Sequence, residues 1–419
     1  MSAASPIAIQ KILSTYNLRD LRPLFRNNAG GQNFLSTVPY RDMEYQNTQH
    51  FTLAPSGAMV SGSLTTTPIT FKLDPGVIKG VMRCFSLVIG LSETGGVNPV
   101  TPIAMECLFD RVVISANNNP NDVIQTIPGD MLYLKNQFIT NEQLTEEIAF
   151  NSANMNNSYA GETAITAGST TYYQIRIPHC VLEKMNMNTV SGSFLIQVYP
   201  RESGVASGTG TLAWANGSGL YLQVQYHTDL VADGKTAQTL ASTVFREPYL
   251  DYRVFTQSQN LAVGKNDIVL SGIDGLCAAM IIEIRVEKTT TNSAYRTYTP
   301  IGGASELTDA SIDLLNGSNL SVLGQGVTGR YIRSIMQGMR TPGAFSASIP
   351  VYYIYFTDDI LGAFSGNGNF AGVLDLGASH YTLSITTGSA FTAGTYYIDI
   401  IFCNYANVAV KNGQVVKLG

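Results

Sequence analysis

The stretch "DPGVIKGVMRCFSLVIGL" at residues 74–91 decides the fold. It opens as a turn, with a glycine on either side of Ile78, and then runs apolar almost without interruption. An apolar run that is bounded by turn residues predicts a buried β-strand. A weaker copy, "LSGIDGLCAAMIIEIRVE", stands at residues 270–287 with two glycines around Ile273. The repetition predicts that one β architecture occurs twice in the chain.

Strings of β-branched and aromatic residues between turn residues predict strands in two sets. The first set covers residues 69–73, 80–91, 107–115, 171–178, 193–200 and 219–226, and the second covers residues 267–270, 276–287, 310–315, 350–356, 381–386 and 395–403. Each set runs in the same order: a short strand, a glycine turn, a long strand, another strand, a short helix and three strands. Two tandem β-sandwich units account for 419 residues, a length too great for one ordinary core. Their boundary is expected within residues 227–243.

Helical signals are confined to three places. In residues 5–25, Ser5 can cap an amphipathic helix. The apolar face of this helix carries Ile9, Ile12, Leu13 and Tyr16. Residues 1–26 have a net charge of +3, from Lys11, Arg19, Arg22 and Arg26 against Asp20. Two further short helices are predicted at residues 128–138 and 329–339, in equivalent places of the two sets.

The composition favours a chain whose surface meets other protein. Hydrophobic residues make up 45% of the sequence and charged residues only 13%, which is about half the charged share of ordinary soluble domains. The net charge is -5, and no basic stripe interleaved with aromatic residues occurs outside the N-terminus. Sequence-specific binding of nucleic acid is therefore not expected.

The cysteines indicate a protein that folds in a reducing cytoplasm. Five of them stand singly in apolar runs, without a CxxC pair: Cys84, Cys107, Cys180, Cys277 and Cys403. This pattern predicts buried, reduced thiols. The sequence shows no secretory leader, and no apolar run approaches the roughly 18 residues of a membrane span.

The histidines do not predict a metal site. They stand far apart, without the spacing by which one strand or helix grips a metal: His50, His179, His227 and His380. His179 beside Cys180 could form a ligand pair, but a structural histidine at the end of a strand is favoured. We therefore expect no metal and no cofactor.

The acidic and glycine-rich motifs do not predict catalysis either. Glu146 and Glu147 are adjacent, as are Asp358 and Asp359, and neighbours on a strand point to opposite faces instead of forming an acid–base pair. The "DGKT" at residues 233–236 lacks the first glycine of a phosphate loop. The single tryptophan is expected in a loop rich in glycine and serine. No catalytic residue is predicted, so the chain is not expected to be an enzyme.

Three segments together carry a resemblance to a known family. They are "KLDPGVIKGVMRCFSLVIGL" at residues 72–91, "CLFDRVVISANNNP" at residues 107–120 and the short helix "GDMLYLKNQF" at residues 129–138. With the long loops that follow and the repeat of the scheme, the chain resembles the double jelly-roll major capsid proteins of the tectivirus and adenovirus lineage. The closest likeness is to those of icosahedral phages with an internal membrane.

This resemblance implies an all-β fold of two tandem eight-stranded jelly rolls, with short flanking helices and an N-terminal amphipathic helix. The expected parts are residues 1–42 for the N-terminal helix and arm, 43–240 for the first jelly roll and 241–419 for the second. It implies homotrimers that form pseudo-hexagonal capsomers of an icosahedral shell over an internal membrane. It also implies a virion location, after synthesis and assembly in the host cytoplasm.

The resemblance further implies the partners. They are other copies of the chain, neighbouring trimers, penton and minor capsid proteins, and the lipids of the internal membrane. The N-terminal helix would face that membrane through Lys11, Arg19, Arg22, Arg26, Ile9, Ile12 and Leu13. The same helix could instead pack beneath its own jelly roll, since an apolar stripe is most often part of a core.

Two other classes of function stay open. A β-sandwich adhesin, spike or glycan-binding module would use the long loops as a binding surface, although the missing leader and the single Trp214 count against it. A jelly-roll hydrolase would need a convergent pair of acids, which the sequence does not display.

Overall fold

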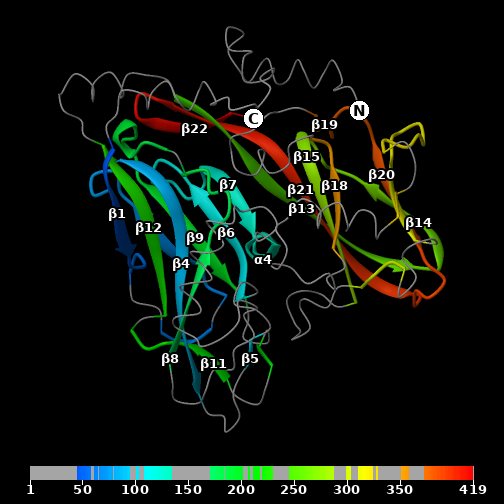
Figure 1. Ribbon diagram of the computed structural model, residues 1–419, viewed down its shortest axis with the longest axis horizontal. Helices are drawn as coiled ribbons and strands as arrows, with labels where there is room; N and C mark the ends of the chain where they lie inside the picture. Colours follow the sequence, from blue (N-terminus) through cyan, green and yellow to red (C-terminus); the bar gives the residue numbers. More distant parts are fainter. Residues whose placement is uncertain are drawn as a thin grey trace.

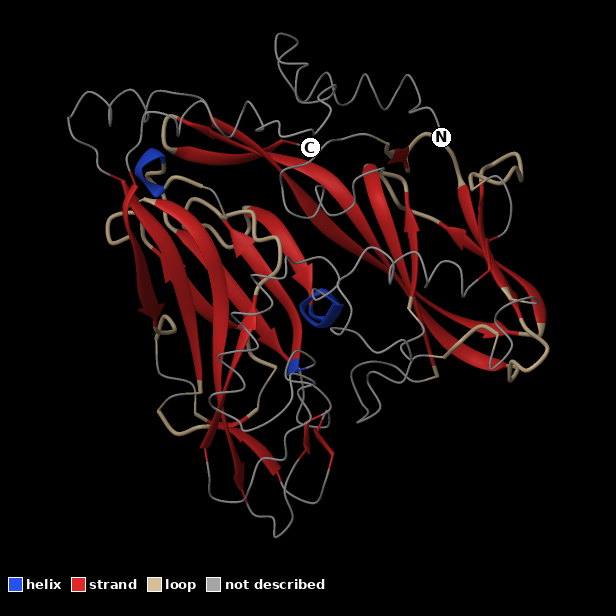
Figure 2. Ribbon diagram, viewed as in Figure 1, coloured by secondary structure: helices blue, strands red, loops and turns tan. Residues whose placement is uncertain are grey.

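In the described part of the chain the regular structure is almost all β-strand, arranged in two units that lie side by side (Figure 1; Figure 2). The computed structural model describes residues 45–57, 61–64, 66–78, 80–94, 101–102, 108–134, 170–183, 185–201, 206–207, 211–217, 219–229, 245–286, 299–302, 310–323, 327–328, 351–357 and 372–418. The first unit holds the strands up to Asp229, and the second holds the strands from Phe245.

Eight principal strands build the first unit, here called the first roll. They are β1 (Tyr45–Leu53), β3 (Ile69–Leu73), β4 (Val81–Thr94), β6 (Phe109–Ser115), β7 (Val123–Pro128), β8 (Thr170–Arg176), β9 (Phe194–Pro200) and β12 (Leu220–Asp229). They form two antiparallel sheets: the β1 sheet, in the order β1-β12-β4-β8, and the β3 sheet, in the order β3-β9-β6-β7. The β1 sheet also contains two shorter strands, β2 (Gly62–Ser63) and β11 (Thr211–Trp214), and β5 (Thr101–Pro102) pairs with β10 (Ala206–Ser207).

Eight strands in the same spatial order build the second roll. They are β13 (Phe245–Leu261), β14 (Gly264–Leu270), β15 (Leu276–Arg285), β16 (Ser311–Leu315), β17 (Val327–Thr328), β18 (Tyr352–Tyr355), β20 (Tyr381–Thr387) and β21 (Gly394–Lys411). The β13 sheet has the order β13-β21-β15-β18, with β19 (Leu374–Asp375) and β22 (Gln414–Leu418) added, and the β14 sheet has the order β14-β20-β16-β17.

The strand orders identify both rolls as jelly rolls of one topology. If the strands of each roll are numbered from first to eighth, both rolls have one sheet in the order 1-8-3-6 and another in the order 2-7-4-5. Two such four-stranded sheets, joined by Greek-key connections, define the eight-stranded jelly roll. The predicted double jelly roll is therefore confirmed, and with it the use of one architecture twice.

The turn that opens the deciding stretch joins the second and third strands in each roll. In the first roll the amide of Gly76 donates a 2.8 Å hydrogen bond to Asp74 Oδ1, and Ile78 is buried. In the second roll Gly272 and Gly275 both have positive φ, at 68° and 104°. Positive φ suits glycine, so both turns are built from residues that tolerate a reversal of the chain.

The pattern of buried side chains along a strand shows whether one or both faces of its sheet are covered. Along β12 buried and half-buried residues alternate, so one face of the β1 sheet packs inward and the other stays open. Along β15, in contrast, every residue from Cys277 to Arg285 is buried. The interior of each roll is filled by large apolar side chains, such as Phe71, Phe85 and Phe194 in the first roll. Complete burial of each such side chain stabilises the fold by about 1.5–3 kcal/mol.

The predicted strands lie where the structure has strands, but they do not cover all of them. The predicted segments overlap β3, β4, β6, β8, β9, β12, β14, β15, β16, β18, β20 and β21. The longer strands that were missed are β1, β7, β13 and β22, whose polar residues dilute the apolar pattern. The short strands β2, β5, β10, β11, β17 and β19 were missed as well. The helix predicted at residues 128–138 is α4, Gly129–Leu134, as far as the described residues extend. A short 3-10 helix, η3 (Met187–Thr189), was not predicted.

Several predictions concern residues outside the described part. These are the N-terminal helix at residues 5–25 and the helix at residues 329–339, which in sequence follows β17 as α4 follows β7. The boundary expected within residues 227–243 needs one correction, because residues 227–229 belong to β12. The division at residues 240 and 241 stays a prediction.

A hairpin at the end of the chain reaches from the second roll to the first. Strand β22 folds back on the end of β21 through a turn at Asn412 and Gly413, which have φ of 52° and 78°. Two positive φ values with Asn-Gly are typical of the tightest hairpin turn. The carbonyl of Gly413 accepts hydrogen bonds from the amide and Oγ of Ser191, at 2.8 and 3.0 Å. The hairpin therefore joins the two rolls.

We expect Gly413→Ala to weaken this contact. A Cβ at this position would lie 2.9 Å from Ser191 Cβ, so steric overlap of about 1–3 kcal/mol adds to about 1–2 kcal/mol of backbone strain. Gly217→Ala is the matched control, because Gly217 has φ of 71° and open space around its Cα. Urea unfolding should show a clearly larger loss for Gly413→Ala, and equal losses would contradict the docked hairpin.

Candidate functional site

The junction between the two rolls is the most elaborate polar region of the described chain. Its central residue is Gln125 on β7, whose side chain is fully buried. Gln125 Nε2 donates hydrogen bonds to the carbonyl of His179 at 2.8 Å and to that of Leu250 at 2.9 Å, and Oε1 accepts one from the amide of Val181 at 2.8 Å. One amide thus ties β7, the turn after β8 and β13 together.

Other bonds between β7 and β13 surround Gln125. The amide of Thr126 donates to Asp251 Oδ1 at 3.2 Å, and Tyr249 Oη donates to the carbonyl of Ile124. Lys417 Nζ on β22 lies 2.6 Å from the other oxygen of Asp251. The edge strand of the β3 sheet is therefore held along the edge strand of the β13 sheet, mostly through backbone groups and short polar side chains.

The turn between β6 and β7 makes a second contact. Asn117 Nδ2 donates to the carbonyl of Val415 at 2.8 Å and to Asp122 Oδ2 at 2.6 Å, while Asn117 Oδ1 accepts from the amide of Val415 at 3.1 Å. Asn117 has φ of 55°, a conformation that asparagine tolerates better than most residues. The turn and the C-terminal hairpin are thus fixed to each other.

The outer face of the β13 sheet carries buried charges. Thr256, Asp399 and Glu283 stand directly opposite one another on β13, β21 and β15, so they share one face, and Arg285 lies two residues further on that face. Arg285 has a side chain only 2% exposed; its Nη2 lies 3.2 Å from Glu283 Oε2 and also pairs with Asp399 Oδ2. Such charges are tolerated in a core only when they are paired.

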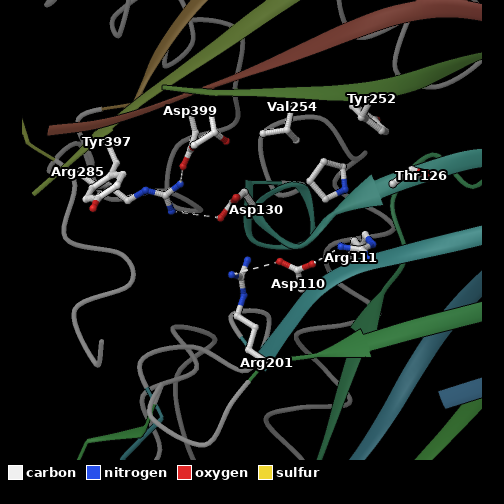
Figure 3. A pocket seen from close by; sticks show the side chains of 12 residues that line it. Asp110, Arg111, Thr126, Asp130, Arg201, Tyr252, Val254, Arg285, Tyr397 and Asp399 are labelled. Atoms are coloured by element: carbon white, nitrogen blue, oxygen red, sulfur yellow. Dashed lines mark hydrogen bonds and ion pairs between the residues drawn. The ribbon is translucent and has the colours of Figure 1, made fainter. Parts of the chain in front are cut away.

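The first roll supplies further partners across the junction. Arg285 Nη1 lies 3.7 Å from Asp130 Oδ1 on α4 (Figure 3). Arg201, which follows β9, donates from Nε to the carbonyl of Phe109 at 2.9 Å and lies 3.5 Å from Asp110. The pair of Arg285 with Asp130 therefore joins the two rolls, while the pair of Arg201 with Asp110 lies within the first roll beside it.

These groups line a cavity of about 360 Å³. Figure 3 shows Asp110, Asp130 and Arg201 on the side of the first roll, and Val254, Arg285 and Asp399 on the side of the second. At the rim the Arg111 guanidinium stacks 4.2 Å from the centre of the Tyr199 ring and lies 2.8 Å from Asp110. The arrangement can hold two sandwiches in a fixed relative orientation, because its charges match only when both rolls are present.

The carboxyl group of Glu283 has a strongly altered acidity. Burial, and after it the nearby Asp130 carboxylate, raise its pKa from 4.5 to about 8, although Arg285 and Arg201 oppose this rise. Protonated Glu283 leaves three acids around three arginines: Asp110, Asp130 and Asp399 around Arg111, Arg201 and Arg285. The neutral form of Glu283 therefore balances the network at neutral pH.

The predicted site residues are not among the residues that the structure describes. Lys11, Arg19, Arg22, Arg26, Ile9, Ile12 and Leu13 all fall outside the described residues, so their role stays a prediction. Within the described ranges, no three His, Cys, Asp or Glu side chains gather as metal ligands. No helix of that same part is long and apolar enough to cross a bilayer. His179 lies in the turn after β8 with φ of 51°, and its carbonyl accepts a hydrogen bond from Gln125 Nε2.

Trp214 requires a correction. It was expected in a loop, but it ends β11, is almost completely buried and lies with its ring centre 6.5 Å from that of Phe109. Pairing with Leu91 on the long strand β4 stabilises this short strand, which local propensity did not predict.

The described cysteines are free thiols. Cys180, Cys277 and Cys403 are buried, and burial raises the pKa of each, whereas Cys84 is half-buried.

Sequence reasoning missed the junction. One signal was available in "MIIEIRVE", where Glu283 and Arg285 interrupt an apolar strand on one face. Two opposite charges two residues apart in a buried strand indicate that this face meets other protein. Their partners Asp130 and Arg201 come from distant segments and could not be assigned from spacing.

Comparisons with solved structures give the class of the fold. PBCV-1 VP54, fitted into a reconstruction of the virophage Sputnik, is similar with a TM-score of 0.60 and 11% identity over 90% of this chain and 98% of the other. The Faustovirus major capsid protein is similar with a TM-score of 0.59 and 8% identity over 92% of both chains. A quasi-atomic model of the PBCV-1 capsid has a TM-score of 0.57 and 12% identity, over 90% of this chain and 98% of the other.

The chain therefore has the double jelly-roll fold of these viral capsid proteins. The resemblance in fold that the sequence predicted is confirmed. No protein-family profile and no curated protein sequence matches the chain.

The acidity of Glu283 predicts how stability depends on pH. The folded pKa of about 8 lies above the ordinary 4.5, so the folded state holds the proton more tightly than the unfolded state. This contribution to stability is complete below pH 4.5 and is lost as the pH rises to about 8, by up to about 1.4 kcal/mol per pH unit. Glu283→Gln, which mimics the neutral form, should remove this loss.

The measurement is urea unfolding at half-unit steps from pH 4.5 to 9. Glu283→Gln should match the wild type at the acidic end and exceed its stability at pH 8 and above. The control is Asp267→Asn, because Asp267 lies on the surface in a 3.2 Å ion pair with Lys265. If the Glu283→Gln profile runs parallel to that of the wild type, Glu283 does not titrate in this window.

Proposed function

We propose that the protein is a major capsid protein that forms homotrimeric, pseudo-hexagonal capsomers of an icosahedral virus shell. The observation that carries the proposal is the pair of jelly rolls with one topology, joined rigidly by a buried polar junction. Three copies of such a chain supply six similar sandwiches, which is what a tile with nearly sixfold outline needs. The similar structures named above are capsid proteins, which supports the same role.

The surface chemistry supports this role. Only 13% of the residues are charged, and a tile must bury its sides against neighbours on all edges. Interfaces of this kind are depleted in Lys, Glu and Asp and enriched in aromatic residues, and the chain contains 22 tyrosines. Each contact can be weak, because many contacts form at once in a shell.

The proposal includes the parts and partners of the chain. Residues 43–240 and 241–419 are the two jelly rolls, and residues 1–42 are an N-terminal helix and arm. The partners are other copies of the chain, penton and minor capsid proteins, and the location is the virion after assembly in the host cytoplasm. The role is structural and needs no catalytic group.

The trimer is tested by mass. Light scattering of the purified full chain in mild buffer should give about three times 45.1 kDa, because symmetric closed assemblies dominate among oligomers. Electron microscopy of the same sample at high concentration should show hexagonal tiles. A monomer whose mass does not change with concentration would exclude the capsomer.

We also propose that residues 1–26 lie against an internal membrane. Ile9, Ile12 and Leu13 form an apolar stripe, and the net charge of +3 attracts anionic head groups by roughly 1 kcal/mol per cation near the surface. A single helix of this kind binds weakly. Three helices in a capsomer, and many in a shell, would bind firmly by avidity.

Removal of residues 1–26 tests the membrane role. The shortened protein should still form trimers but should lose salt-sensitive flotation with vesicles of anionic lipid. A full-length control with Arg19, Arg22 and Arg26 changed to Gln keeps the apolar stripe and should lose the salt-sensitive part alone. Equal flotation of shortened and intact trimers would leave the helix as a packing element.

A further inference from the structure

The two rolls of one chain meet through unlike surfaces. The first roll contributes the edge strand β7, helix α4 and the turn at residues 116–122, whereas the second contributes the outer face of the β13 sheet and the C-terminal hairpin. From left to right in Figure 1 the order is the β1 sheet, the β3 sheet, the β13 sheet and the β14 sheet. A contact between unlike surfaces can repeat from one unit to the next.

Because the rolls share one topology, each has a counterpart of both surfaces. The outer face of the β1 sheet corresponds to the outer face of the β13 sheet, which the first roll covers. The turn between β16 and β17 corresponds to the turn at residues 116–122 between β6 and β7. Within one chain these two counterparts lie at opposite ends, and neither takes part in the junction described above (Figure 1).

The outer face of the β1 sheet, here called the open face, has the chemistry of an interface. Strand register places these residues on it: His50, Thr52, Cys84, Ser86, Val88, Tyr172, Gln174, Arg176, Tyr221, Gln223 and Gln225. Arg176 is the one residue of this set with a fixed charge, and it is buried in a 3.3 Å ion pair with Glu183. All the others except Ser86 are half-buried or exposed. Gln174 Nε2 donates to Gln223 Oε1 at 3.1 Å and so joins β8 to β12 across β4.

A sheet face on which the register-assigned residues open to solvent carry no fixed charge is unusual. Sheets that face solvent normally present charged side chains, which also prevent association with other strands and sheets. A face of Gln, Ser, Thr, Tyr and Val instead matches the centre of protein interfaces, where charges are depleted. The equivalent face of the β13 sheet is buried against protein, with Ile281 and Ile401 fully buried on it.

The turn between β16 and β17 is here called the free turn, and its described residues, 316–323, include an asparagine with positive φ, as its docked counterpart does. Asn319 has φ of 56°, as Asn117 has φ of 55° in the first roll. Asn316 Oδ1 accepts hydrogen bonds from the amides of Ser318 and Leu320, both at 3.0 Å, so the turn is preformed. Leu320 at its tip is 64% exposed, although apolar.

We infer that the open face of one copy docks the side of the second roll of another copy that carries the free turn, head to tail. The inference rests on the proposed capsomer and names the surfaces that join its subunits. The contact between chains then repeats the contact between rolls within a chain. Six rolls from three copies close a ring in which no open face and no free turn remains exposed.

The test uses one change on each surface of the full chain. Gln223→Arg places a charge in the middle of the open face, and Leu320→Arg places one on the free turn. Each charge is desolvated without a partner in the trimer, so each change should raise the trimer dissociation constant at least about a hundredfold. Thr52→Arg is a second variant on the open face and should act in the same direction.

Val269→Arg is the matched control. Val269 is 61% exposed on β14, the strand of its sheet farthest from β17, and the counterpart strand β3 makes none of the described bonds between the rolls. This variant should remain a trimer with the wild-type dissociation constant. Far-UV circular dichroism and the Tm of the monomers confirm that all variants are folded.

Mixing the two defective proteins identifies the head-to-tail geometry. Gln223→Arg chains keep an unchanged free turn, and Leu320→Arg chains keep an unchanged open face. The free turn of the first variant should therefore bind the open face of the second. The ring cannot close, and sedimentation equilibrium should show a heterodimer of about 90 kDa, twice 45.1 kDa, which neither variant forms alone.

The outcomes separate this inference from the proposed function. A wild-type monomer would overturn the capsomer itself. A wild-type trimer that survives Gln223→Arg, Thr52→Arg and Leu320→Arg would overturn the assignment of surfaces and leave the capsomer intact. Loss of the trimer without a heterodimer on mixing would overturn the direct contact between the open face and the free turn.

Discussion

The β13 sheet must be covered on both faces, and the rest of the architecture depends on this constraint. A single jelly roll buries only the inner face of each sheet, yet β15 is buried at every position from Cys277 to Arg285. The second face carries Ile281 and Ile401 beside an arginine and two acids. Left in water it would expose a large apolar patch, so the second roll is complete only when the first roll lies against it.

Polar groups determine how the first roll is oriented against the β13 sheet. Apolar packing alone permits small rotations and slips, whereas Gln125 satisfies three hydrogen bonds only in one arrangement of β7, β13 and the turn after β8. The ion pairs of Arg285 with Asp130 and Asp399 add a second constraint from α4 and β21. A buried network of this kind contributes little net stability but makes misplacement costly. A fixed orientation suits the proposed capsid role, because small angular errors would accumulate over a shell.

The duplication gives the proposed capsomer a reason for the low charge of the chain. In the junction of the two rolls, unlike faces meet, and a counterpart of each face lies at the opposite side of the other roll. In the proposed ring, the open face around Gln223 and the free turn with Leu320 would cover each other and leave the water together. A chain that buries its sides in this way needs few charged residues.

The sequence by itself determined the strand content, the duplication and the turns. Glycine at the turns before β4 and β15 and apolar runs inside these strands act locally, so period and turn chemistry were enough to place them. It did not determine β1, β13 or β22, because these strands depend on partners far along the chain for their burial. The junction was decided only by the tertiary structure. Gln125 and Glu283 lie on different rolls, far apart in the sequence, and the pKa of a carboxyl group such as Glu283 follows from neighbours that only folding brings together.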